Sequence, residues 1–319
     1  MMTTSSERVG LLALVFVTMS PSLLNIRRII GGLAAVLVLL LLQGCSAIKL
    51  GYNSGTELAY FWLDGYVDFR EDQNPKMREE LGKLLAWHRA EELPKLAELL
   101  QKVQRLAAAD VLPGQICGVY ADVRERFEAT ARRADPAAVW LAMSLSVDQL
   151  KHIDRQLKKA DDKFRRDTQD LTPAERLERR VKSNVERAEE FYGRLDDRQV
   201  TLLRSAMEAA TSKPELNQSE RQRRQADFAL TLRLASGQTA SANGGKPNPA
   251  EVLTLLRGYQ ERLARPPGAE YRAYSEKLTQ ESCATFAALH NSTSKEQRER
   301  AVRRLAAYER DARELHSQR

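Results

Sequence analysis

Helix starts are the feature of this sequence that most restricts its fold. A capping side chain precedes a proline, which is favoured at the first position of a helix, in Asn74-Pro75, Asp135-Pro136, Thr172-Pro173 and Asn248-Pro249. Capping boxes, in which Glu or Gln follows the cap three positions later, are formed by Ser146 with Gln149, Thr172 with Glu175, Asp196 with Gln199 and Asn248 with Glu251. So many starts predict a chain of successive helices.

Between these starts, apolar residues recur with the period of a helix. Leu177, Val181 and Val185 lie on one face of a predicted helix, which Gly193 is expected to end. Pro94 should end or kink the helix in which it lies, because it lacks a backbone donor. The last two helices are predicted over 269–290 and 295–315. Apolar and polar residues rarely alternate, so we predict an all-α fold, an elongated multi-helix bundle with antiparallel helical hairpins.

The N-terminal residues have the pattern of a lipoprotein signal. Arg27 and Arg28 precede the apolar run 29–42, which is followed by Gln43, Gly44 and Cys45. A run of 14 residues is too short for a membrane-spanning helix, which needs about 20. We therefore expect cleavage before Cys45 and attachment of palmitate-type acyl chains to this residue. Several such chains make a lasting membrane anchor.

The expected location of the protein and the division of its chain follow from this signal. Ser46 follows Cys45 where Asp would favour retention, so we expect the protein at the periplasmic face of the outer membrane; the alternative is an uncleaved inner-membrane anchor. We expect a signal peptide over 1–44, or from Met19 if translation starts there, and a lipidated tether over 45–55. A main bundle over 56–235, a flexible linker over 236–249 and C-terminal helices over 250–319 that pack back on the bundle complete the predicted division.

Two cysteines, Cys117 and Cys283, remain after Cys45. In an oxidising compartment such a pair is a candidate disulfide, which would close a loop of about 165 residues. The alternative is a pair of buried free thiols. Neither residue has a second Cys or a His at the spacing of metal ligands, so no metal site is expected.

Aromatic residues are concentrated over 52–69, from the end of the predicted tether onward, where six of them lie. Asp64 and Asp68 lie among them with the spacing of one helical face. One interpretation is an interaction surface, because Tyr and Trp suit half-solvated sites; the other is that the rings cover the end of the bundle core. The candidate surface comprises Tyr60, Phe61, Trp62, Asp64, Tyr66 and Asp68.

Basic residues gather at three places, and in an exported protein they would meet anionic lipids or acidic polymers rather than nucleic acid. The alternative is an ordinary solvated helix face. Smaller groups lie at 221–224 and 298–304. The main candidate face, within 151–166, contains Lys151, Arg155, Lys158, Lys159, Arg165 and Arg166.

Signals for catalysis are weak. The four histidines, His88, His152, His290 and His316, are far apart in the sequence and lie in no metal-binding or nucleophile motif. The segment 292–295 matches Ser-x-x-Lys by its letters, but a helix cap at Thr293 or Ser294 explains it better. We expect no cofactor and no enzymatic activity; an enzyme with a site assembled from distant residues is the remaining alternative.

Several motifs resemble a family of proteobacterial lipoproteins of unknown function. They are Tyr52-Asn53, the run 61–68 (Phe-Trp-Leu-Asp-Gly-Tyr-Val-Asp), Trp87-His88-Arg89, Glu92-Leu93-Pro94, and Cys283 with 289–291 and 297–298. The resemblance covers most of the chain after the signal. It implies a helical envelope lipoprotein and supplies no catalytic residue.

A weaker resemblance concerns three segments that begin at Leu145, Leu171 and Leu195. They are similar to the Leu-Thr-x-x-Gln repeats of Spy-type periplasmic chaperones, although Glu175 replaces Gln and Asp196 replaces Thr. Taken together, the signal, the helical pattern and the absence of a catalytic motif lead us to expect a binding or scaffolding protein of the envelope. Its expected partner is a membrane, an envelope protein or an anionic polymer. A chaperone that holds clients on the basic face is the alternative.

Overall fold

The computed structural model describes residues 47–238 and 246–318. Helix α2 (Ala47–Asn53) belongs to a first unit, and Ser54–Arg319 forms a second, compact unit. Cys45 and the predicted signal lie outside the described residues, as do residues 239–245 of the predicted linker.

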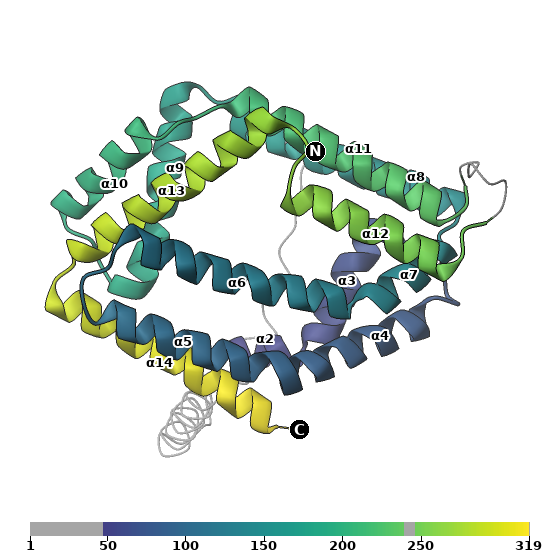
Figure 1. The fold of residues 1–319 in the computed structure, drawn as a ribbon, viewed down its shortest axis with the longest axis horizontal. Helices are drawn as coiled ribbons and strands as arrows, with labels where there is room; N and C mark the ends of the chain where they lie inside the picture. The colour runs from purple at the N-terminus through teal and green to yellow at the C-terminus, as the bar shows by residue number, and fades with distance from the viewer. Residues whose placement is uncertain (1–46, 239–245, 319) are drawn as a thin grey trace, which may run out of the picture. The chain divides into compact units, whose positions relative to one another are not determined.

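The compact unit consists of helices joined mostly by short connections (Figure 1), while α11 and α12 are joined by the longer segment 236–248. No strand occurs among the described residues, which confirms the all-α multi-helix bundle. Two π-helical turns, η1 (His88–Glu92) and η2 (Arg165–Gln169), follow α4 and α8 without a break. The α-helices are α3 (Gly55–Val67), α4 (Asn74–Trp87), α5 (Leu93–Ala107), α6 (Pro113–Arg133), α7 (Asp135–Ser144), α8 (Val147–Phe164), α9 (Pro173–Tyr192), α10 (Asp197–Ala209), α11 (Pro214–Ala235), α12 (Pro249–Ala264), α13 (Ala269–Asn291) and α14 (Lys295–Ser317).

Helix pairs, both near and far in sequence, hold this unit together. The consecutive helices α3 and α4, α9 and α10, and α11 and α12 contact each other as hairpins. The C-terminal helices return to earlier parts of the unit, because α14 lies along α5 and α13 contacts α6 (Figure 1). These pairs connect the final helices to α5 and α6, and α12 with α7 and α3 with α8 are further pairs that are distant in sequence.

Apolar side chains form several core clusters, two of which share Phe69 and Leu141. One cluster joins α7, α8, α11 and α12 around Ile153 and Val252, and another joins α9, α10, α13 and α14 around Leu195 and Leu203. A third holds α3 against α4 through Tyr60, Met77 and Leu81. Leu145 and Leu195, which precede two of the capping boxes, are buried in these clusters.

The four predicted capping boxes are all present, but two predicted single caps are wrong. Helix α4 begins at Asn74, whose Oδ1 accepts a hydrogen bond from the Tyr60 hydroxyl (2.6 Å) instead of capping the helix. Helix α7 begins at Asp135, whose buried carboxylate accepts hydrogen bonds from Arg257 (2.9 Å) and Gln260 (3.4 Å). In both cases a tertiary partner competes successfully for the capping side chain.

The regular α-helix is interrupted just before Pro94, as predicted: α4 ends at Trp87, the π-helical turn η1 follows, and α5 begins at Leu93 and runs at an angle to α4 (Figure 1). The Leu93 N–H donates to the His88 carbonyl, five residues earlier. A wider turn of this kind makes room for the proline ring, which would clash with the carbonyl four residues back in a regular α-helix. Gly193 ends α9 with φ +77°, and the last two helices lie at 269–291 and 295–317, as predicted.

Candidate functional site

The predicted aromatic surface separates into buried and exposed members. Tyr60 is buried and Phe69 stacks on its ring, with the two ring centroids 5.5 Å apart. Tyr66 packs against the core cluster around Ile153. Phe61 and Trp62, however, are 64% and 65% exposed. Tyr60 and Tyr66 therefore fit the interpretation that the rings cover the core, whereas an interaction surface at Phe61 and Trp62 stays a prediction. Tyr52 lies in α2, in the other unit.

Tyr60 is fixed on several sides. The guanidinium carbon of Arg78 lies 3.5 Å from the centre of its ring, within the range of a cation–π contact. Burial raises the pKa of the Tyr60 hydroxyl, and the neighbouring Asp64 carboxylate raises it further. The hydroxyl is thus a protonated donor to Asn74 at neutral pH, and its role is to hold α3 on α4.

Asp64 and Asp68 do not share a helical face, contrary to the prediction, because α3 ends at Val67. Asp68 has φ +58°, a left-handed conformation that Asp tolerates better than most residues. The Asp64 carboxylate accepts a hydrogen bond from the Phe69 N–H (2.8 Å). The Asp64 carboxylate thus stabilises the end of α3, whereas the Asp68 side chain stays exposed, with its Oδ2 3.9 Å from His152 Nδ1.

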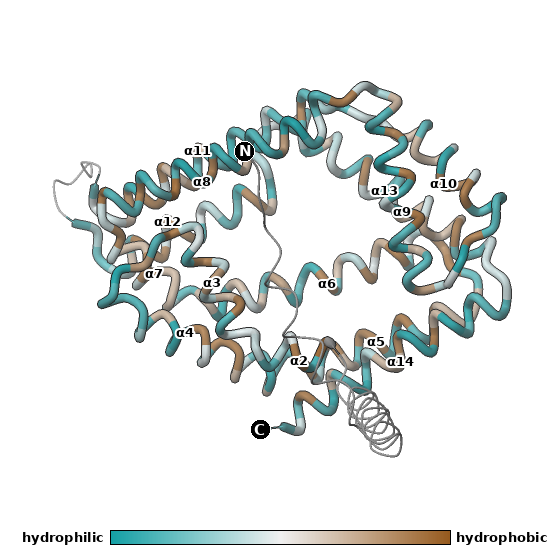
Figure 2. Tube along the Cα trace, turned by 180° about the vertical axis from the view of Figure 1, so that it is seen from behind, coloured by the Kyte–Doolittle hydropathy of each residue, from teal (hydrophilic) through white to brown (hydrophobic). Residues whose placement is uncertain are grey.

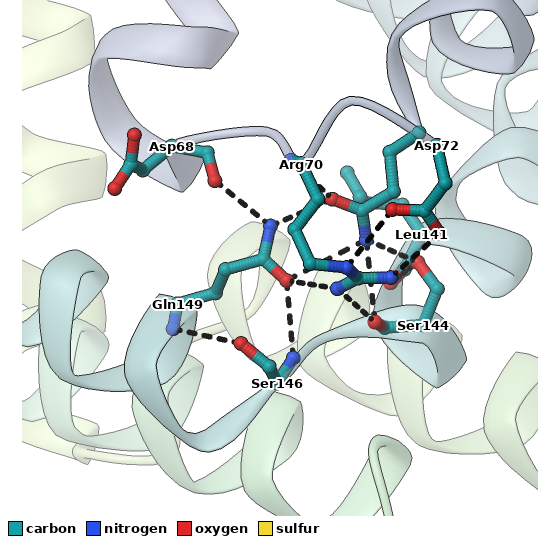
Figure 3. A network of polar contacts seen from close by, with 8 residues as sticks. Asp68, Arg70, Asp72, Leu141, Ser144, Ser146 and Gln149 are labelled. Carbon is teal, nitrogen blue, oxygen red and sulfur yellow. Dashed lines mark hydrogen bonds and ion pairs between the residues drawn. The ribbon is translucent and has the colours of Figure 1, made fainter.

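A buried pair of glutamines joins the start of α8 to the start of α4. Gln149 Nε2 donates to Gln73 Oε1 (2.7 Å). It also donates to the Asp68 carbonyl (3.0 Å), as Figure 3 shows. Gln149 Oε1 accepts from the Ser146 N–H (3.1 Å) and from Arg70 Nη1 (2.7 Å). Gln73 and Gln149 are 1% and 4% exposed. We call this pair the first glutamine clamp.

A second glutamine clamp joins α10 to α14 in the same manner. The side-chain amides of Gln199 and Gln297 face each other, with N···O distances of 2.8 and 3.1 Å. Gln199 Nε2 also donates to the Ser292 carbonyl (3.1 Å), and Gln297 Nε2 to the Arg194 carbonyl (3.0 Å). Each of these two glutamines is the third residue of a capped helix, so the second clamp joins two helix N-termini.

The segment that matched Ser-x-x-Lys is one half of the second clamp. Ser294 Oγ accepts the Gln297 N–H (3.2 Å), and Gln297 Oε1 accepts the Ser294 N–H (2.9 Å). Ser294 therefore caps α14, as predicted. Ser292, the serine of the Ser-x-x-Lys match, donates its hydroxyl to the Leu289 carbonyl (2.7 Å).

The basic face of α8 and η2 is exposed throughout. Lys151 pairs with Asp148 (3.1 Å), whereas no ion pair to another described residue is formed by Lys158, Lys159, Arg165 or Arg166. Figure 2 shows that the trace of α8 and α11 is mostly hydrophilic. The residues that share this exposure are Lys151, Arg155, Lys158, Lys159, Lys163, Arg165 and Arg166.

Cys117 of α6 and Cys283 of α13 form a disulfide, as predicted, with their Cα atoms 5.5 Å apart. The bond ties α6 to a helix more than 160 positions away in sequence. Ion pairs add to this attachment on the side of α6 that faces α5: Lys102 with Asp122 (2.6 Å) and Arg126 with the buried Glu92 (3.3 Å).

Another side of α6 presents apolar residues that sequence reasoning missed. None of the residues of α6 is buried. Tyr120, Val123 and Phe127 follow each other at helical spacing and are 57%, 37% and 73% exposed. We call these three residues the α6 apolar row. Their spacing resembles that of a core-facing stripe, so the sequence alone does not reveal their exposure.

The buried His290 is part of the structural core. Its Nε2 lies 2.8 Å from the Ala109 carbonyl, which can only accept, so Nε2 carries the proton and Nδ1 accepts from the Tyr192 hydroxyl (2.9 Å). Burial lowers the pKa of His290 and raises the pKa of Tyr192 to about 12. The described residues contain no cluster of three His, Cys, Asp or Glu side chains that could hold a metal ion.

The arrangement defines an all-α protein whose polar clusters mainly join helices to one another. Residues 65–241, more than half of the chain, match a family of unknown function (DUF6279), and the chain belongs to this family. No curated protein and no solved structure matches it. Within the described part of the chain, no helix is both long and apolar enough to cross a membrane.

Proposed function

We propose that this protein is a lipoprotein of the outer membrane, anchored through Cys45 at the periplasmic face, and that it binds or scaffolds other envelope proteins without catalysing a reaction. The observation that carries this proposal is the α6 apolar row on a helix that a disulfide fixes in place. Exposed apolar rows of this kind mark protein interaction sites.

Three features support the compartment. The pattern of a lipoprotein signal ends at Cys45. The disulfide between Cys117 and Cys283 is a bond that persists in oxidising compartments such as the periplasm. The motif 61–68, which lies mostly on α3, is the most specific part of the resemblance to proteobacterial lipoproteins.

The anchor is tested by mass spectrometry of the native protein. We expect an N-terminal peptide that starts at Cys45 and carries acyl chains, and we expect Cys45→Ser to move the protein out of the membrane fraction. An unmodified thiol at Cys45, or a leader still attached, would overturn the proposed compartment.

The binding surface is tested by placing a photo-crosslinking amino acid at Tyr120 or Phe127 in living cells. We expect one discrete product at both positions, and its loss when Val123→Glu is added. Position 125 is the matched control: it is exposed on the same helix, about 140° away from Tyr120 at about 100° per residue. Equal products at 120, 125 and 127 would contradict a specific partner surface.

The chaperone alternative is favoured by the exposed cations of α8 and η2. A chaperone should suppress aggregation of an unfolded client at near-stoichiometric ratio, and reversing the charges of Lys158, Lys159 and Arg166 should weaken that suppression. The chain without residues 1–45 is suited to this assay because it retains the compact unit Ser54–Arg319. Clear suppression would promote the chaperone over the scaffold.

A further inference from the structure

A cavity of about 470 Å³ that is open to solvent lies among α8, α11, α12 and the first turn of α13. Its volume is within the range of small-molecule sites, about 300–1,000 Å³. The apolar part of its lining comprises Leu157, Phe164, Phe228, Tyr259, Leu263 and Tyr271. Neither the two glutamine clamps nor the α6 apolar row contributes a residue to this lining.

Two arginines in the lining are each bonded to a carboxylate through the Nε atom only. Arg221 Nε donates to Asp161 (3.0 Å), and Arg224 Nε donates to Glu220 (2.6 Å). The terminal nitrogens of Arg221 and Arg224 form no bond to another described residue. A guanidinium has five N–H donors, so each of these side chains retains donors for an anion.

Aromatic rings fix the same two guanidinium groups from the side. The guanidinium carbon of Arg221 lies 4.7 Å from the centre of the Phe164 ring, and that of Arg224 lies 5.5 Å from the centre of the Tyr271 ring. Both rings also line the cavity. The cations are therefore positioned before any ligand arrives, which reduces the entropy lost on binding.

The charges around the cavity leave a surplus of positive charge. Burial by itself raises the pKa of Glu220, but hydrogen bonds from Arg223 and Arg224 outweigh burial and hold that pKa below its ordinary value. Glu220 is thus ionised and shared by two arginines. Arg223 and Arg262 also share Asp227. The charged residues of the lining itself are Glu220, Arg221 and Arg224, so the lining carries one more positive than negative charge.

We propose that this cavity binds a small anionic amphiphile, with an apolar chain or ring among the aromatic side chains and a carboxylate or phosphate group on Arg221 and Arg224. An ammonium ligand would meet the surplus positive charge. A neutral apolar ligand would leave the arginine donors unused. This site is separate from the α6 apolar row, and the proposal does not depend on the lipid anchor.

Isothermal titration of the chain from residue 46 tests the site with dodecyl phosphate and dodecanoate, both below their micelle-forming concentrations. We expect saturable binding of one molecule per chain, and at least tenfold weaker binding of dodecanol and of inorganic phosphate. Tighter binding of dodecyl phosphate assigns a phospholipid-like ligand and tighter binding of dodecanoate a fatty acid; either result supports the site. Binding of dodecanol as tight as that of both anions overturns it.

Variants locate the binding. Arg221→Gln combined with Arg224→Gln should weaken binding at least tenfold, because charge-assisted hydrogen bonds are lost. Leu263→Trp should block the apolar part while keeping both arginines. Arg187→Gln, an exposed arginine on α9, is the matched control and should bind as wild type does. Thermal unfolding verifies that each variant is folded. A folded Leu263→Trp variant that binds with unchanged affinity would overturn the proposal.

Discussion

Gln199 and Gln297, which are 98 positions apart, face each other with both side-chain amides within hydrogen-bond distance. Each amide also closes the capping box of its own helix, so one side chain serves both local and tertiary structure. In the Gln73 and Gln149 pair, Gln149 has the same double role at the start of α8. The two clamps give the most direct account of how helices distant in the sequence are joined.

Removing a clamp should cost more than removing an ordinary surface glutamine. We expect Gln149→Ala to lower the free energy of unfolding by about 2–3 kcal/mol, because buried Gln73, the Asp68 carbonyl and Arg70 each lose a hydrogen-bond partner. Urea unfolding measures the change. Gln222→Ala, at an exposed position of α11, is the control and should change stability by less than about 0.5 kcal/mol. Equal effects of the two substitutions would contradict the structural role of the clamp.

The disulfide should stabilise the fold through the long loop that it closes. We expect Cys117→Ser with Cys283→Ser to lower the free energy of unfolding by about 3–5 kcal/mol, mainly because the unfolded chain gains freedom. A reductant should lower the urea midpoint of the wild-type chain from residue 46 and leave that of the variant unchanged. Two titratable thiols in the denatured, unreduced wild type would disprove the bond.

Gly193 should be intolerant of any side chain. Its φ is +77°, and an added Cβ would lie 3.1 Å from Nη1 of Arg300. We expect Gly193→Ala to destabilise the protein by at least about 1 kcal/mol. Gly65→Ala, within α3 with no atom near the added Cβ, should instead stabilise it by about 0.5–1 kcal/mol. Thermal unfolding of the two variants distinguishes these opposite signs, and a shared sign would refute the comparison.

His290 makes stability depend on pH. Burial holds its pKa below the ordinary value of 6.5, so the unfolded chain binds more protons than the folded one as the pH falls through 6.5. Stability is therefore retained above this range and lost on acidification, by at most about 1.4 kcal/mol per pH unit for one group. We expect His290→Asn to have a smaller loss between pH 7.5 and 5.5 than wild type, although its absolute stability is lower.

Burial also lowers the pKa of His88. This residue should therefore preserve part of the pH dependence of stability in the His290→Asn variant. His152→Asn is the control, because this side chain is only partly buried and no buried network contains it. The unfolding free energies at both pH values give the slopes. A slope in His290→Asn as steep as in wild type would contradict the assignment.

The capping boxes could be predicted because all their parts lie within four residues. Asn74 and Asp135 show where this local reasoning fails: Tyr60 and Arg257, brought near by folding, take the side chains that were expected to cap. The disulfide could be expected from the cysteine count and the predicted compartment. The exposure of the α6 apolar row could not be expected, because its residues have the spacing of a face that packs on a core.

The candidate sites show the same difference between local and tertiary information. The basic face of α8 was predicted from sequence, since consecutive charged residues on a surface helix stay solvated. Arg221 and Arg224 also looked like a surface patch in the sequence. Only the tertiary structure reveals that carboxylates and aromatic rings hold them beside a cavity. Phe61 and Trp62 could not be distinguished from Tyr60, because spacing does not show which rings another helix covers.

The π-helical turn η1 has a consequence for how the chain tolerates change. It contains one residue more than a regular turn, and each residue of a helix rotates the next one by about 100° about the helix axis. Deleting a single residue between 88 and 92 would therefore turn α5 so that Ala97, now fully buried, no longer faced inward. Substitutions in this segment alter single contacts, whereas a change in its length would misalign α5 with α14 along their whole shared surface.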